Sequence, residues 1–383
     1  MSKSNPAILL ALTLLLASPR PARADGSITY KYEDYSEEGG RVGVKTQGVV
    51  LSQDIGPDSR FGLTSITDSI AGATPTGLPA PAGSDQVPLA HLEDHRKAWD
   101  AELEHQFNRV GLTAGYSQSR EHDYVSRGWS LNSLTDFNEK NTTVLAGVAG
   151  HSDNVETFYD PQRLYVGKQA ESVILGVTQL LNPLTKVTFN VTWARETGYL
   201  SDQYKLVTQN VEVIPGTYFP LVYGENRPGE HNSGVAYLSL NRALPSVSAA
   251  LEANYRFFSD TYGVVANTLE LRWLQKLGPY VTLSPEARVY EQNAAKFYYY
   301  DLTKTDIQPT FTPNPSGPAY SSDYRLSSLY TYTLGLKAEW KVRDWARLDV
   351  AYDRYQMHGR DGVTPQSAYP TANILTLGAS LTW

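Results

Sequence analysis

The sequence contains no cysteine among its 383 residues. This absence excludes disulfide bonds, thiolate metal sites, thiol redox chemistry and covalent haem attachment through Cys-x-x-Cys-His. Long apolar runs are also missing, because no stretch approaches the ~18 consecutive apolar residues that a membrane-spanning helix needs. If the chain crosses a membrane, we expect it to do so without helices.

The chain also has no excess of basic residues. The chain has 33 Lys and Arg against 40 Asp and Glu, which gives a formal net charge of −7. We therefore expect no nucleic acid partner, since nucleic acid binding requires a basic surface. The histidines show no ligand spacing such as His-Glu-x-x-His, and there is no Gly-rich phosphate loop between a strand and a helix. We predict no bound cofactor and no metal.

Residues 1–24 have the pattern of a secretory signal peptide. Lys3 supplies a positive charge, residues 7–17 form a small and apolar run, and Ala22-Arg23-Ala24 has the form that precedes cleavage. This divides the chain into a signal peptide, 1–24, and a mature domain, 25–383. An exported protein without disulfides needs another source of stability, and a closed, hydrogen-bonded barrel supplies one.

The C-terminal segment, Ile374–Trp383, alternates apolar residues with mostly small or polar ones. Such alternation is typical of a strand with one face in an apolar medium. Its terminal aromatic residue resembles the last strand that outer-membrane barrels present to their assembly machinery. The candidate assembly signal comprises Leu377, Ala379, Leu381 and Trp383. From this segment alone, an amphipathic strand of a soluble sandwich stays open.

About 16 alternating segments follow one another from Ser27 to Trp383. If the first strand leaves the periplasm, every connection on the periplasmic side is six residues or shorter. The five long connections, all on the other side, are 71–94, 152–168, 198–230, 293–323 and 359–370. Long external loops and short periplasmic turns are typical of outer-membrane barrels. We predict an all-β fold, a transmembrane antiparallel barrel of about 16 strands with both termini in the periplasm.

Charged residues of the predicted strands lie opposite the apolar faces. A charge facing lipid near the bilayer midplane costs about 2–4 kcal/mol, so we expect these charges in the lumen. They either select solutes by charge or pair across strands as structural cross-links. Their mixed signs argue against strong ion selectivity. The candidate lumen-lining residues are Glu252, Arg256, Glu270, Arg272, Lys276, Glu286, Arg288, Lys337 and Glu339, with Lys341, Arg347, Asp349 and Asp353 as further members.

Two smaller polar groups suggest chemistry. Glu121 and Asp123 share a face near the outer rim, where they could hold a hard cation such as calcium or hydrogen-bond loop backbone. His231 and Ser233 face one way, as the base and nucleophile of an outer-membrane phospholipase would. No third group that would orient the histidine is evident. We therefore expect a polar loop-to-strand junction at His231 and no enzyme activity.

Two aromatic runs lie in the predicted external loops, Phe297–Tyr300 and Tyr218–Pro220. Both could be platforms for a carbohydrate or a partner protein. Alternatively, the first run belongs to the interfacial girdle of aromatic residues, and the second packs its loop into the lumen.

Several stretches carry a shared pattern. Residues 119–128 and 136–143 read E-x-D-Y-x-S … D-F-N-x-K-N-T-T, and further matches are Gly198–Asp202, Glu225–Pro228, Tyr255–Phe258, Pro285–Gln292 and Ala294–Tyr298. In this order they resemble a bacterial outer-membrane family catalogued as domain of unknown function 3570. The chain departs from the pattern at Phe257-Phe258 and at Thr261-Tyr262. The resemblance implies an outer-membrane β-barrel and implies no particular activity. It also associates such barrels with periplasmic thioredoxin-like and flavin-transferring proteins.

We therefore expect an outer-membrane barrel that acts as a porin-like or solute-specific channel, occluded in part by its own loops. The alternative is a non-conducting scaffold that houses or docks periplasmic or extracellular partner proteins of an export or redox system. A minor alternative is an outer-membrane hydrolase. The expected partners are outer-membrane lipid, the barrel assembly machinery and, for a scaffold, a periplasmic protein.

Overall fold

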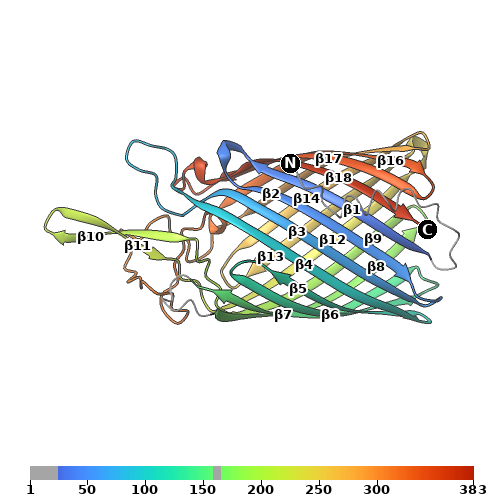
Figure 1. Cartoon of the computed structure of the whole chain (residues 1–383), viewed down its shortest axis with the longest axis horizontal. Helices are drawn as coiled ribbons and strands as arrows, with labels where there is room; N and C mark the ends of the chain where they lie inside the picture. The colour runs from blue at the N-terminus through green and yellow to red at the C-terminus, as the bar shows by residue number, and fades with distance from the viewer. Residues whose placement is uncertain (1–24, 158–164) are drawn as a thin grey trace, which may run out of the picture.

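The computed structural model describes residues 25–157 and 165–383, so the predicted signal peptide, 1–24, lies outside the described residues. Sixteen strands form one closed antiparallel barrel, and β10 and β11 form a separate two-stranded sheet (Figure 1). The predicted barrel of about 16 strands is confirmed. In the described ranges, no helix is long and apolar enough to cross a membrane.

The strands are β1 (Gly26–Glu37), β2 (Gly43–Asp54), β3 (Ser59–Pro75), β4 (Leu89–Phe107), β5 (Val110–Arg120), β6 (Tyr124–Phe137), β7 (Thr142–Glu156), β8 (Tyr165–Asn182), β9 (Thr185–Gly198), β10 (Leu206–Ile214), β11 (Thr217–Gly224), β12 (Glu230–Leu244), β13 (Ala249–Asp260), β14 (Val265–Leu277), β15 (Val281–Gln292), β16 (Leu329–Arg343), β17 (Ala346–Gly359) and β18 (Thr371–Thr382). The short 3-10 helices are η1 (Glu38–Gly40), η2 (Pro245–Val247), η3 (Tyr324–Leu326) and η4 (Gln366–Ala368).

Alternation along the strands decides which side chains face outward. In β14, Leu269 and Leu271 are 47% and 43% exposed on the outer surface. Between them Glu270 turns to the opposite face, where it lies 3.7 Å from the Arg272 guanidinium. Since the backbone groups pair with neighbouring strands, the outer surface presents mainly apolar side chains to its surroundings, as a barrel in lipid must.

The first and last strands close the barrel. Lys31 of β1 pairs with Gly378 of β18, which in turn pairs with Asp349 of β17. The Lys31 ammonium reaches over Gly378 to the Asp349 carboxylate, at 2.5 Å. A Cβ at position 378 would meet the ends of both side chains, so the glycine leaves room for this ion pair. The closure thus combines backbone pairing with an inward-facing ion pair.

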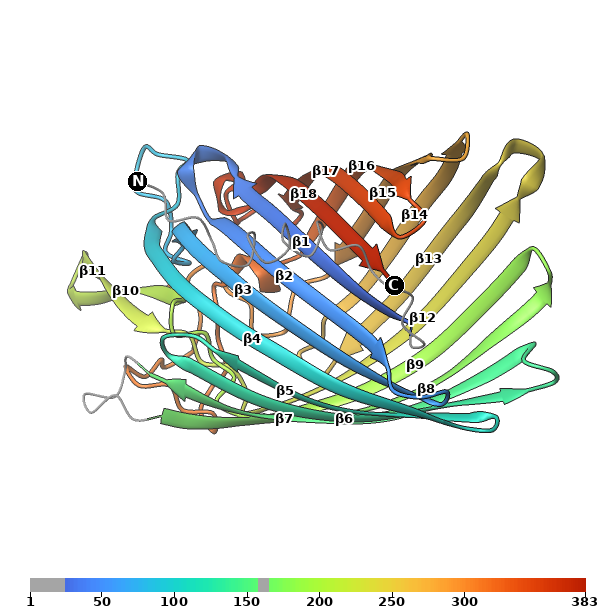
Figure 2. The same ribbon diagram turned by 45° about the vertical axis from the view of Figure 1, so that its right-hand side comes forward.

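The connections are sorted by length between the two ends of the barrel. At one end, the turn end, strands are joined by two to four residues, and the C-terminus lies there (Figure 1). At the other, the loop end, the longest connections are 199–229 and 293–328, and β10 and β11 project beyond the barrel (Figures 1 and 2). The predicted asymmetry between long loops and short turns is confirmed.

Three of the predicted long connections include residues that the structure places in strands. Residues 71–75 and 89–94, predicted to be irregular, extend β3 and β4, and β7 and β8 run into the predicted loop 152–168. Residues 198–230 contain the β10–β11 hairpin around Pro215-Gly216. Hydropathy misses these parts because the strands continue beyond the apolar belt, where backbone hydrogen bonds hold them and polar side chains alternate freely.

Candidate functional site

The two long loops together form a folded cap, defined here as residues 199–229 and 293–328. They share a hydrophobic cluster of Val207, Tyr223, Leu302 and Tyr320, of which all but Tyr223 are 0% exposed. Figure 2 shows residues 293–328, in orange, at the loop end of the barrel. A shared core means that the loops fold as one unit and not as independent flexible segments.

The cap is attached to the barrel rim at separate points. Lys205 Nζ donates to the carbonyl oxygen of Pro75 in β3 at 2.6 Å, and Gln203 Nε2 donates to Asp123 at 2.6 Å. Tyr262, between β13 and β14 on the far side of the barrel order, donates from its OH to Pro228 O at 3.2 Å. Between β17 and β18, Tyr369 OH bonds the Ser327 hydroxyl at 2.7 Å. Because these anchors are distributed around the rim, the cap crosses the mouth.

Six charged residues form a network inside the cap. Arg227 lies 2.6 Å from Glu225 and 2.9 Å from Asp323, and Arg325 lies 2.6 Å from both Asp323 and Asp202. Lys205, 2% exposed, completes a set of three cations and three anions. Asp202, Glu225 and Arg227 come from the first loop, while Asp323 and Arg325 come from the second. The network therefore links the two loops.

The two buried carboxyls have pKa values shifted in opposite directions, because their neighbouring charges differ. Burial raises the pKa of Glu225 to about 6, a shift that Arg227 opposes and Asp323 increases. Burial would also raise the pKa of Asp323, but Arg325, Arg227 and Lys205 outweigh it and hold that pKa below its usual range. Asp323 is thus the fixed anion of the network, and Glu225 is its proton-sensitive member.

The nine candidate lumen residues lie on the inner wall. Arg272 is the centre of one group, with its guanidinium 3.2 Å from Glu252, 3.7 Å from Glu270 and 2.5 Å from Glu286. A cavity of about 430 Å³ nearer the loop end is lined by Arg256, Glu270, Glu286 and Arg288. A larger cavity of about 900 Å³ toward the turn end is lined by Glu252, Arg272, Lys276, Glu286, Lys337 and Glu339. The wall from β13 to β17 is therefore both cross-linked and hollowed.

The opposite wall carries an acidic strip that the sequence reading missed. Asp100 and Glu102 of β4 stand opposite Ser117 and Gly115 of β5, and Asp100 lines a cavity of about 390 Å³ with Ser117. Within residues 25–157 and 165–383, neither carboxylate forms an ion pair. A period-two reading of residues 94–104 would have revealed them, because Trp99 and Leu103 mark the outer face.

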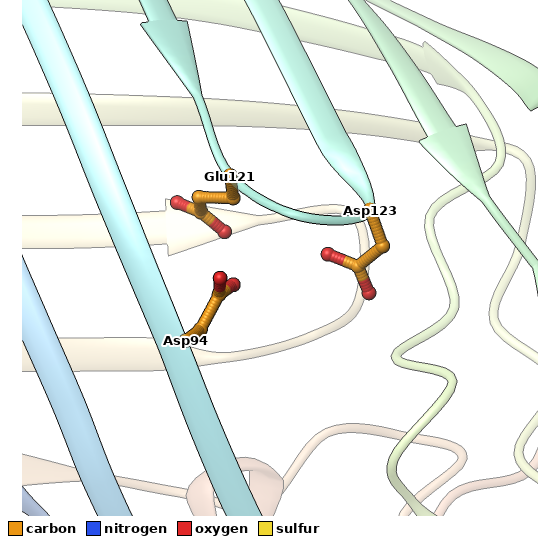
Figure 3. A group of neighbouring side chains, drawn as sticks. All are labelled: Asp94, Glu121 and Asp123. Carbon is orange, nitrogen blue, oxygen red and sulfur yellow. The ribbon is translucent and has the colours of Figure 1, made fainter.

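Three carboxylates gather at the rim (Figure 3). One ligand atom each of Asp94, Glu121 and Asp123 lies within 4.8 Å of the others. Asp123 accepts hydrogen bonds from Gln203 and Tyr204 of the cap, so it binds cap side chains and not loop backbone. Burial raises the pKa of Glu121, and the Asp94 charge adds to the shift. Asp123 is therefore an acidic anchor for the cap.

His231 has the third group that the sequence did not reveal, but in the wrong arrangement for hydrolysis. Its Nε2 lies 2.9 Å from Asp260 and its Nδ1 lies 3.9 Å from Glu196. The ring packs against Tyr262 with the centroids 4.1 Å apart and the planes tilted by 31°. With a carboxylate facing each nitrogen, the imidazole has no free acceptor for a proton from Ser233. The arrangement is that of a charged cross-link.

The two aromatic runs have different positions. Phe297 is 6% exposed and packs edge-on against Tyr262 at 4.8 Å, so the first run belongs to the cap core and not to an interfacial girdle or an open platform. Tyr218 and Phe219 are 59% and 54% exposed on β11, so the second run does not pack into the lumen. Sequence could not separate these cases, because both runs lie in Pro-rich loops.

Residues 8–373 match the family described as "Protein of unknown function (DUF3570)". The chain belongs to this family. In this DUF3570 barrel, three of the shared stretches meet in the cap and its rim: Gly198–Asp202, Glu225–Pro228 and Ala294–Tyr298. The resemblance stated from the sequence is confirmed. No curated protein matches the DUF3570 chain.

Similar folds occur among solved structures. CdiB from Acinetobacter baumannii is 8% identical, with 94% of this chain and 60% of that chain covered and a TM-score of 0.50. The bacterial polysaccharide outer membrane secretin is 11% identical over 94% of this chain and 98% of that chain, with a TM-score of 0.49. The siderophore receptor PirA from Pseudomonas aeruginosa is 11% identical, with 95% of this chain and 62% of that chain covered and a TM-score of 0.45. The DUF3570 chain spans less than two thirds of CdiB and of PirA, and the likeness concerns the fold alone.

Proposed function

We propose that the protein is a non-enzymatic channel for small polar solutes across the outer membrane, with its outer mouth closed by the cap. The observation that carries this proposal is the combination of a hollow, charged inner wall with a folded cap at one end only. A barrel that serves solely as an anchor has no need of either feature. The proposal places the loop end outside the cell and the turn end in the periplasm.

The inner wall supports passage of water and polar solutes. The cavity of about 900 Å³ is lined by both acidic and basic groups, and hydration stabilises the charges of such a lining. Charged rings of this kind select solutes in channels. The ion pairs around Arg272 also stabilise the wall, so the lining and cross-linking roles assigned from the sequence are compatible.

Conductance in planar bilayers tests the proposal. We expect small, intermittent currents from the wild-type chain. A variant lacking residues 206–224, which removes Val207 and Tyr223 from the cap core, should give larger and steadier currents. The matched control shortens only the hairpin tip, residues 212–218, and should behave as the wild type. Silence of both the wild type and the 206–224 deletion, with correct barrel folding, would overturn the channel.

The β10–β11 hairpin favours the scaffold as a second candidate. Near its tip Val213, Ile214 and Phe219 are 62%, 60% and 54% exposed, and Glu212 is the single charge of residues 206–224. Exposed apolar patches on a part that projects from the barrel are typical of protein interaction sites. If the tip docks a partner, its replacement by polar residues should abolish partner capture and leave conductance unchanged.

A further inference from the structure

Glu225 lies at the seam between the two loops of the cap. Its side chain is 1% exposed. Oε1 accepts a hydrogen bond from the backbone N–H of Asp202 at 2.5 Å and faces Arg227 Nε at 2.6 Å. Oε2 accepts from the Ser321 hydroxyl of the second loop and from Arg227 Nη2 at 3.3 Å. One carboxyl group thus holds parts of both loops.

The seam can accommodate either protonation state of this carboxyl. A serine hydroxyl is both a donor and an acceptor, so a protonated Oε2 can donate to Ser321 while Oε1 keeps the hydrogen bond from the Asp202 N–H and its contact with Arg227. The ionised form pairs with Arg227, but it also places a second anion beside the buried Asp323 and away from water, and the effect of burial is larger than that of Arg227. Proton uptake by Glu225 therefore relieves a cost that exists only while the cap is closed.

We propose that Glu225 is a proton-operated latch: its protonated carboxyl holds the cap closed, and its ionisation loosens the seam between residues 199–229 and 293–328. The inference rests on the proposed channel for its role in transport. The latch itself is a property of the cap and is measurable without any current.

The direction of the pH dependence follows from the surroundings of Glu225. The charged and titratable groups that face it are Asp202, Lys205, Arg227, Tyr262, Asp323 and Arg325. Burial raises its pKa from 4.5 to about 6, with Arg227 opposing the shift and Asp323 adding to it. A carboxyl whose pKa is raised in the closed cap stabilises closure below its ordinary pKa, and this contribution is lost as the pH rises through 6. Closure should thus weaken by roughly eightfold between pH 5 and pH 7.5.

The neighbouring anion acts in the opposite direction but in another pH range. The pKa of Asp323 is lowered in the closed cap. Its contribution to closure is present above its ordinary pKa and is lost only as the pH falls below that range. Between pH 5 and pH 7.5, Asp323 stays ionised, so the seam responds mainly to Glu225.

Because the chain has no cysteine, a single engineered thiol reports on opening of the cap. Ala295→Cys places the thiol in the buried cluster with Tyr262 and Phe297, and Ser316→Cys places one on the exposed surface of the same loop. The measured quantity is the N-ethylmaleimide labelling rate at position 295 divided by that at position 316, in detergent-folded full-length chain. This ratio cancels the direct effect of pH on the thiol.

We expect the ratio to rise roughly eightfold from pH 5 to pH 7.5 in the otherwise wild-type chain. With Glu225→Gln, a neutral mimic of the protonated form, the ratio should stay low at both pH values. The matched control is Glu291→Gln, whose half-exposed ion pair with Arg360 lies outside the cap, and it should keep the wild-type response. A ratio that does not change with pH in the wild-type background would overturn the latch, whether or not Glu225→Gln folds.

Persistence of the full pH response in a folded Glu225→Gln variant would also overturn it. Conductance then separates the latch from the proposed function. A pH-dependent labelling ratio in a barrel that never conducts would keep the latch and reject the channel. Conductance in a barrel whose labelling ratio does not change with pH would keep the channel and reject the latch.

Discussion

Trp383 and Gly26 exchange two backbone hydrogen bonds, each 3.0 Å long, from the N–H of one residue to the carbonyl oxygen of the other. The last residue of the chain thus pairs directly with the start of β1. The Trp383 indole also donates to Gln53 of β2 at 3.1 Å. The terminal aromatic residue therefore spans the junction between β1 and β18, at which the barrel closes.

The junction between β1 and β18 leads to a prediction about assembly. Deletion of Trp383, or Trp383→Asp, should leave unfolded and protease-sensitive chains, since both changes remove the indole contact and the apolar end of the candidate assembly signal. Trp383→Phe is the control and should assemble, because it keeps the aromatic end. Heat-modifiable gel migration and membrane levels measure the outcome. Normal levels of Trp383→Asp would show that assembly does not read this residue.

A second prediction concerns the Arg272 group. Arg272→Gln should lower stability by about 1–3 kcal/mol, because it leaves Glu252, Glu270 and Glu286 facing one another in a partly solvated wall. Arg256→Gln is the matched control, since Arg256 lies 5.4 Å above the Phe258 ring on the same wall and has no ion pair among the described residues. The midpoint of the heat-induced gel shift measures both. Equal, small effects would mean that Arg272 is a solvated pore residue and not a cross-link.

The rim carboxylates give a prediction with a definite pH sign. The pKa of Glu121 is raised, first by burial and then by Asp94, so its ionisation costs stability as the pH rises. Glu121→Gln should therefore raise thermal stability by several tenths of a kcal/mol at pH 7.5 and have no effect at pH 4. Asp136→Asn is the control at the turn end, where that carboxylate accepts from Thr143 at 2.7 Å. A loss of stability at pH 7.5 that a chelator reproduces in the wild type would instead indicate a bound cation.

A fourth prediction concerns the cap core. Leu302 is 0% exposed, so Leu302→Ala should cost about 2–4 kcal/mol within the cap. The loss should appear as proteolysis within residues 293–328 while the barrel still resists heat in gels. Val213→Ala, at a position that is 62% exposed, is the control and should leave the digestion pattern unchanged. If Leu302→Ala instead unfolded the barrel, cap and barrel would form a single cooperative unit.

The acidic strip of β4 gives a fifth prediction, which applies to the proposed channel. Asp100→Asn combined with Glu102→Gln should move the reversal potential in a salt gradient toward anions, because these carboxylates have no cationic partner among the described residues. Asp58→Asn, in an exposed turn, is the control. An unchanged reversal potential in a conducting double variant would show that the solute path avoids β4.

Sequence alone determined the barrel, its strand number and the sorting of its connections. These features are local: each strand must alternate because successive side chains point to opposite faces, and every short turn except Asp344-Trp345 contains Gly, Pro or Asn. For the same reason, the inner face of residues such as Arg272 and Glu286 followed from counting by two. Even so, strand ends beyond the apolar belt, as in β3 and β4, left no hydropathy signal.

Only the tertiary structure decided what the long loops do. Glu225, Arg227, Asp323 and Arg325 are separated by up to 100 residues along the chain, and nothing local in the loops predicts that they share one buried network. The same holds for His231, whose partners Glu196 and Asp260 come from β9 and β13. In irregular segments the side chains do not alternate with a fixed period, so the sequence does not show which of them face inward. Their contacts arise from packing between distant parts of the chain.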